Sequence, residues 1–131
     1  MEDIKSLIPR DKFDMENVEK LKSLETAVLK PILPDLFEWI QDINWPIAPE
    51  LAKILVSCGR DIVPELKKAL ASGDDCWQFA CIGWIIKDLA SEIVLEIVPD
   101  LQRIAYHPNS TEKYCEFDVE AKEILRAIVA I

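Results

Sequence analysis

Hydrophobic positions are densest between residues 74 and 89, in the stretch DDCWQFACIGWIIKDL. Two acids open this stretch, and a nearly unbroken apolar run follows from Cys76 to Ile86. The apolar residues cover every face of the helix that their spacing predicts, which is typical of a helix packed on several sides. The run is too short and too closely flanked by charges to cross a bilayer. We therefore predict the central helix of an all-α domain at residues 74–89.

A pattern of two apolar residues, proline, an acid and leucine occurs three times along the chain. Its copies are Ile32–Leu36, Ile62–Leu66 and Ile97–Leu101, which are 30 and 35 residues apart. Internal similarity at such a period is typical of stacked helical repeats. After each proline the sequence predicts a short helix, a polar turn and a second, apolar helix. The predicted repeats are residues 31–60, 61–90 and 91–131.

The prolines themselves constrain where the helices begin. Proline costs little in a first turn, where its missing N–H has no intrahelical acceptor. Asp61 as N-cap would place Pro64 in such a turn. For Pro99 two interpretations are open: a helix that starts near Leu95, or one that starts near Ser91 and bends at the proline. We favour the bent helix.

The residues before the first repeat are predicted to form an arm over 1–13 and a capping helix over 14–30. Asp14 is a suitable N-cap, and the amphipathic pattern that it opens continues to about Leu24. This helix should cover an exposed end of the core. Four aromatic residues inside the predicted helices are expected to be core residues: Phe37, Trp39, Phe79 and Trp84.

Length and composition support one compact helical domain over residues 1–131, with half of the residues apolar and only three glycines. The net charge is −9, and residues 31–100 hold twelve acids and five bases. Such a body repels phosphate, so nucleic-acid binding is disfavoured and a basic protein partner is favoured. The opening MEDIKSLIPRDKFD lacks the apolar region of a signal peptide, so neither secretion nor a membrane anchor is expected.

The cysteines lie mostly in apolar helical contexts, without a C-x-x-C pair: Cys58, Cys76, Cys81 and Cys115. We interpret them as small buried hydrophobic residues in a reducing cytoplasm, not as disulfide or zinc ligands.

A proline-containing first helix, a short acidic turn and an apolar second helix resemble the HEAT-repeat plan over residues 31–131. A narrower resemblance rests on Pro34–Ala48 (PDLFEWIQDINWPIA), Asp74–Trp77 and Ile8–Asp14, which are similar to an uncharacterised bacterial domain-of-unknown-function family. These resemblances imply a right-handed αα-superhelix of about three HEAT-like hairpins with an N-terminal capping helix, and a bacterial origin. They imply no active site.

The turns between the paired helices collect acids and aromatic residues, and equivalent turns of a solenoid line up along one edge. This edge could recognise a basic partner, whose arginines would pair with carboxylates and stack on rings. The alternative is structural: acids cap helices, and the tryptophans fill the seams between repeats. The candidate interaction surface is Asp42, Asn44, Trp45, Asp74, Asp75, Trp77, Glu116 and Asp118.

The sequence contains few residues whose pattern indicates catalysis or metal binding. The single histidine, His107, is expected at a helix end, where its cation would suit the dipole. Asp74 and Asp75 could begin a metal site, but helix capping explains them better. The sequence holds no phosphate-binding loop, Walker lysine or zinc-binding H-E-x-x-H motif. We therefore expect no catalytic residue, metal or cofactor.

Three functions are compatible with these patterns. The leading one is a non-catalytic protein-interaction module, immunity- or adaptor-like, that binds a basic protein through the acidic and aromatic edge. The alternative is a HEAT-like small-molecule enzyme with a pocket near the repeat turns, lined by Asp42, Asp75, Trp45 and Trp77. The third is a structural subunit that self-associates through the terminal helix, by Ile128, Val129 and Ile131. The sequence leaves the oligomeric state open.

Overall fold

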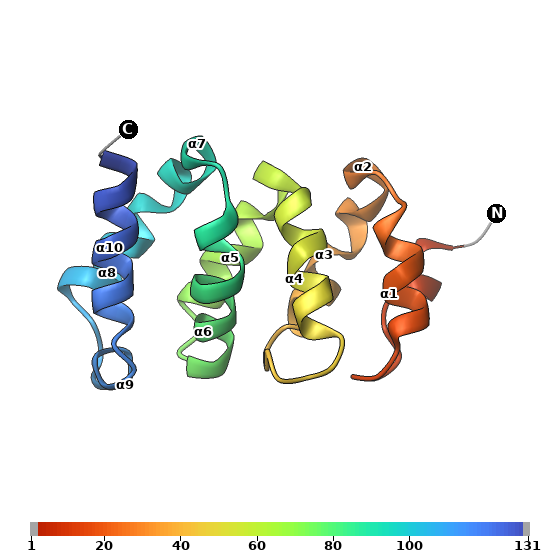
Figure 1. Ribbon diagram of the computed structural model, residues 1–131, viewed down its shortest axis with the longest axis horizontal. Helices are drawn as coiled ribbons and strands as arrows, with labels where there is room; N and C mark the ends of the chain where they lie inside the picture. Colours follow the sequence, from red (N-terminus) through yellow and green to blue (C-terminus); the bar gives the residue numbers. More distant parts are fainter. Residues whose placement is uncertain (1–2, 130–131) are drawn as a thin grey trace.

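Helices are the only regular secondary structure in the part of the chain that the computed structural model describes, which is residues 3–129, with side chains to residue 128. No strand occurs among these residues. Figure 1 shows one row of helices side by side along the molecule. In order, these are α1 (Met15–Lys22), α4 (Ala48–Ser57), α6 (Asp75–Trp84) and α10 (Phe117–Val129), and each contacts the next.

Three other principal helices pack against this row or against one another. They are α3 (Leu33–Glu38), α5 (Val63–Leu70) and α8 (Val98–Tyr106). Helix α5 packs on α6 and on α3, and α8 packs on α10. Three short helices complete the chain between them: α2 (Thr26–Leu29), α7 (Ser91–Val94) and α9 (Ser110–Tyr114). One apolar core therefore runs between the paired helices.

The proline pattern takes the same local structure at each of its copies. A 3₁₀ turn ends at its first residue: η2 (Lys30–Ile32), η3 (Gly59–Ile62) and η5 (Leu95–Ile97). The next residue begins an α-helix, and the proline lies in the first turn of that helix. The first isoleucine and the final leucine of each copy are buried: Ile32, Leu36, Ile62, Leu66, Ile97 and Leu101. The pattern therefore marks equivalent helix starts.

Two predictions about these starts are wrong. Pro99 does not bend a helix that begins at Ser91, because α7 ends at Val94 and a new helix begins at Val98. Placing Pro99 in a first turn avoids the lost hydrogen bond and ring clash of a proline inside a helix. Asp61 is not the N-cap before Pro64, since it lies within η3 and Ile62 holds the N-cap position.

The N-terminal segment differs in part from its predicted form. A short 3₁₀ helix, η1 (Ile4–Leu7), lies within the predicted arm. Asp14 caps α1 as predicted, and its carboxylate accepts the backbone N–H of Asn17. Residues 14–30 hold two short helices, α1 and α2, because the chain turns at Ser23 before α2 begins.

Helix α6 is less enclosed than its apolar sequence predicts. Phe79 is 50% exposed and Trp84 is 41% exposed, so the prediction that both are core residues is wrong. The helix has α4 and α10 on its two sides and α5 behind it, which leaves its remaining face to solvent. The helix ends at Trp84, and a 3₁₀ turn, η4 (Ile86–Asp88), follows. Phe37 is buried as predicted, and Trp39 is partly buried against the core.

Candidate functional site

The three repeat turns meet at a cavity between α6 and the start of α10, which we call the turn cavity. It encloses about 210 Å³ and receives residues from the turn after α3, the start of α6 and the turn between α9 and α10. Its lining residues are Asp42, Ile43, Asn44, Asp75, Cys76, Phe79, Cys115 and Phe117. Three residues of the candidate surface, Asp42, Asn44 and Asp75, therefore share one cavity with an apolar wall.

The first acidic turn is held by its own backbone hydrogen bonds. The Asp42 carboxylate accepts the N–H of Asn44 at 2.9 Å, and the Asp42 carbonyl accepts the N–H of Trp45 at 3.0 Å. Asp42 is half-buried and Asn44 is exposed. This local bonding fixes the Asp42 carboxylate beside the cavity.

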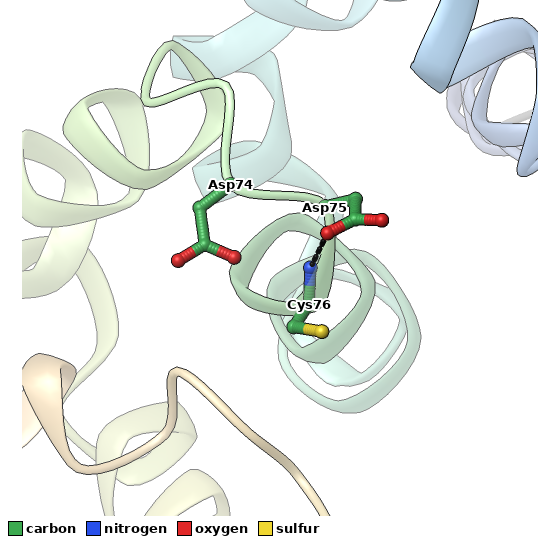
Figure 2. A group of neighbouring side chains, drawn as sticks. All are labelled: Asp74, Asp75 and Cys76. Atoms are coloured by element: carbon green, nitrogen blue, oxygen red, sulfur yellow. Dashed lines mark hydrogen bonds between the residues drawn. The ribbon is translucent and has the colours of Figure 1, made fainter.

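Figure 2 shows the second acidic turn, in which Asp74, Asp75 and Cys76 lie at the start of α6. Asp74 accepts the N–H of Trp77 at 3.1 Å, which confirms it as the helix N-cap. The Asp75 carboxylate accepts the N–H of Cys76 at 2.9 Å. The ligand-type atoms of the three residues lie within 4.8 Å of one another, and all three residues are exposed. Both carboxylates already accept backbone N–H groups at the start of α6, so this arrangement fits helix capping better than a metal site.

The thiol beside these acids is not activated. Desolvation of the thiol and the negative charges of Asp75, Asp74 and Asp42 raise the pKa of Cys76 above its ordinary value of 9.0. A thiol in such surroundings stays protonated near neutral pH and is a poor nucleophile. Burial likewise raises the pKa of Cys81, deeper in α6, to about 12. These environments argue against nucleophilic catalysis by either residue.

The two tryptophans of the candidate surface pack against the core. The indole N–H of Trp77 donates to the carbonyl of Phe37 at 3.0 Å and so ties α6 to α3. Trp45 lies edge-on to Trp39, with ring centroids 5.7 Å apart. Both Trp45 and Trp77 are partly buried against the core, and neither lines the turn cavity. Their geometry agrees with the structural interpretation.

The third turn contributes one acid to a second, adjoining cavity, which we call the Gly83 pocket. It encloses about 140 Å³ and shares Phe79, Cys115 and Phe117 with the turn cavity. Its other lining residues are Ile82, Gly83, Lys87, Glu116 and Glu120. Asp118, although only two residues from Glu116, is half-buried in the first turn of α10 and lines neither cavity.

Some lining residues were not predicted for the site. Phe79 is predicted as a core residue and Gly83 has no predicted role. The prediction that the cysteines are buried is wrong for Cys76, which is exposed, whereas Cys115 is half-buried. A signal was present in the sequence, because Cys76, Phe79 and Gly83 follow one another at intervals of three and four residues, along one face of α6. That face is the one which no other helix of the described chain covers.

Other predicted features are placed as follows. His107 is exposed at the C-cap of α8, at the helix end where the sequence predicts it. Ile128 is half-buried against the core, whereas the side chain of Val129 and the whole of Ile131 lie outside the described residues. None of the helices within residues 3–129 has the length and apolar character needed to cross a membrane.

The comparison with known proteins gives a family without an assigned activity. No curated protein matches the chain. A family model described as a domain of unknown function, DUF5071, matches residues 7–125, which is nearly the whole chain and includes every residue of both cavities. The match confirms the predicted resemblance to an uncharacterised domain-of-unknown-function family. The chain therefore belongs to the DUF5071 family.

Proposed function

We propose that this protein is a non-catalytic interaction module that binds a basic protein partner at the turn cavity. One observation carries the proposal: Asp42 and Asp75, from different turns, line one cavity together with Phe79 and Phe117. Carboxylates beside an apolar wall suit a segment that carries both cationic and apolar side chains. The net charge of −9 adds a long-range attraction for such a partner.

The framework that presents this cavity is proposed to be a right-handed superhelix of HEAT-like hairpins. The support is the equivalent helix start at each proline pattern and the row formed by α1, α4, α6 and α10. The four free cysteines support the reducing bacterial cytoplasm proposed as its location. An adaptor or an immunity-type inhibitor of a basic bacterial protein fits these features.

A second candidate, a small-molecule enzyme, is favoured by the shared position of Asp42 and Asp75. Two observations weigh against it. Trp45 and Trp77, expected as pocket walls, pack against the core instead and do not line the turn cavity. The turn cavity, at about 210 Å³, is also smaller than the roughly 300–1,000 Å³ of ordinary ligand pockets.

Charge reversal at the cavity tests the proposal. The probe is a short peptide of arginine, lysine and leucine, titrated into the purified protein by calorimetry. Asp42→Lys with Asp75→Lys should abolish binding and leave the helical circular dichroism unchanged. The control, Glu25→Lys with Glu38→Lys, makes the same change in net charge at two exposed acids that do not line the turn cavity. Equal loss in both variants, or no binding to the unaltered protein, would contradict the proposal.

A further inference from the structure

The Gly83 pocket has a feature that the packing of the chain does not require. Gly83 lies in helical conformation near the end of α6, and its φ is outside the left-handed range that favours glycine. A Cβ added at this position meets no atom within 4 Å, so no neighbour in the described structure demands a glycine here. Glycine in a helix is nevertheless less stable than alanine, because it loses more backbone freedom on folding. Its effect is to keep open the space above it.

That space has the size and surroundings of a site for one side chain. The pocket volume of about 140 Å³ is close to that of an engineered cavity of roughly 150 Å³ that accepts a benzene ring. Phe79, half-exposed, and Phe117, buried, supply its aromatic walls. An apolar stem and a planar group would both find contacts between these rings.

The rim of the pocket is negatively charged. Glu116 is exposed at the turn between α9 and α10, and Glu120 follows it by one helical turn. Glu120 is paired with Lys87, whose ammonium lies 2.6 Å from its carboxylate. Glu116 is therefore the carboxylate on this rim that a visiting cation would meet first, while Asp42 and Asp75 lie in the adjoining turn cavity.

We propose that the Gly83 pocket binds a single arginine side chain of the partner protein, an inference that rests on the proposed function. The arginine stem lies between Phe79 and Phe117, and its guanidinium pairs with Glu116. Arginine fits better than lysine, because the guanidinium plane stacks on an aromatic face and its fork pairs with a carboxylate through parallel hydrogen bonds. The residues that flank this arginine then reach the turn cavity.

Matched peptides test whether the pocket distinguishes arginine from lysine and from the uncharged citrulline. The probe is a short, capped peptide with one central arginine between leucines and with lysines near its ends. In the comparison peptides, lysine or the uncharged isostere citrulline replaces the central arginine. The arginine peptide should bind at least about tenfold more tightly than the citrulline peptide and measurably more tightly than the lysine peptide. Equal binding of the arginine and citrulline peptides would overturn the inference.

Filling the pocket tests its location. Gly83→Leu occupies the open space, and its expected effect is to remove the preference for arginine over citrulline. Glu116→Gly removes the carboxylate and should reduce the preference by a similar factor. Gln102→Leu, which adds a leucine at an exposed position of α8 outside the pocket, serves as the control and should retain the preference. Thermal unfolding of each variant verifies that it folds.

The outcomes separate this inference from the proposed function. If charge reversal at Asp42 and Asp75 abolishes peptide binding while Gly83→Leu and Glu116→Gly keep the full arginine preference, the interaction module stands and the arginine pocket is wrong. If no basic peptide binds to the unaltered protein, both are wrong. Loss of the preference in both pocket variants, with retention in Gln102→Leu, supports the inference.

Discussion

Arg103 and Glu112 form a two-fold ion pair that joins α8 to α9. The guanidinium donates to both carboxylate oxygens of Glu112, at 2.9 and 2.6 Å. The Glu112 side chain is 0% exposed, and it also accepts from the Gln78 amide at 2.7 Å and from the backbone N–H of Asn109 at 2.9 Å. Since Gln78 donates in turn to the carbonyl of Leu70, this one carboxylate links α5, α6, α8 and α9.

The first prediction concerns the acid stability that this carboxylate provides. The bonds from Arg103, Asn109 and Gln78 lower the pKa of Glu112 from its ordinary value of 4.5 to about 2. A folded pKa below the unfolded one stabilises the fold above about pH 4.5, and the stabilisation is lost as the pH falls toward 2. Glu112→Gln should therefore lower the free energy of unfolding near neutral pH by about 2 kcal/mol, the value of a charge-assisted hydrogen bond.

Denaturant unfolding over a pH series checks this prediction. The difference between the unaltered protein and Glu112→Gln should shrink as the pH falls below about 4.5. Glu25→Gln, at an exposed acid, gives the control series. If the difference in the free energy of unfolding stays constant down to the lowest pH at which the protein folds, the charge of Glu112 is not what stabilises the fold.

A second prediction concerns Asp14, which combines a helix cap with an ion pair. Its buried carboxylate accepts from Asn17 N–H and from the backbone and guanidinium of Arg10, and these bonds lower its pKa to about 2. Asp14→Ala removes the cap and the pair, and should cost about 2 kcal/mol. Asp14→Asn keeps a capping oxygen and should cost about half as much. Because the Arg10 side chain is largely exposed, the cost of the Asn variant should fall in high salt, which unfolding in low and high NaCl measures.

The repeated proline pattern shows how far local sequence predicts this fold. Proline tolerates a first turn and little else in a helix, so three copies of the pattern indicate three helix starts. The pattern does not predict that the helix breaks before Pro99, because a bent helix and a new helix share the same apolar spacing. The choice between them depends on how α7 and η5 pack against the neighbouring repeat, which is tertiary information.

Which residues of α6 are buried is harder to predict than where the helices begin, because burial also depends on tertiary packing. Its sequence is apolar on all faces, but which face remains open depends on the number of neighbouring helices. Phe79 and Trp84 lie where no further helix covers them. The sequence also predicts only part of the buried hydrogen-bond network around Glu112. The Asn109–Glu112 spacing is that of a capping box, whereas Arg103 and Gln78 are brought to it by the packing of separate helices.

The third prediction compares two residues in left-handed conformation. Gly59 has φ 62° and Glu116 has φ 63°, but only glycine adopts this region at no steric cost. Gly59→Ala should destabilise the fold by about 1 kcal/mol through backbone strain, because its new Cβ would meet only an ordinary contact, 3.7 Å from Ile93. Glu116→Gly should stabilise the fold by up to about 1 kcal/mol. Denaturant midpoints should therefore move in opposite directions, and shifts of the same sign would contradict the prediction.

The last prediction separates the two tryptophans of α6. Trp77→Phe removes the indole N–H and leaves the Phe37 carbonyl without this donor, which should cost about 1–2 kcal/mol. Trp84→Phe, at a side chain 41% exposed, should change stability by no more than about 0.5 kcal/mol. The midpoint of thermal unfolding should therefore fall by several degrees in Trp77→Phe and hardly at all in Trp84→Phe. Equal effects would mean that the bond from Trp77 to the Phe37 carbonyl does not contribute measurably to stability.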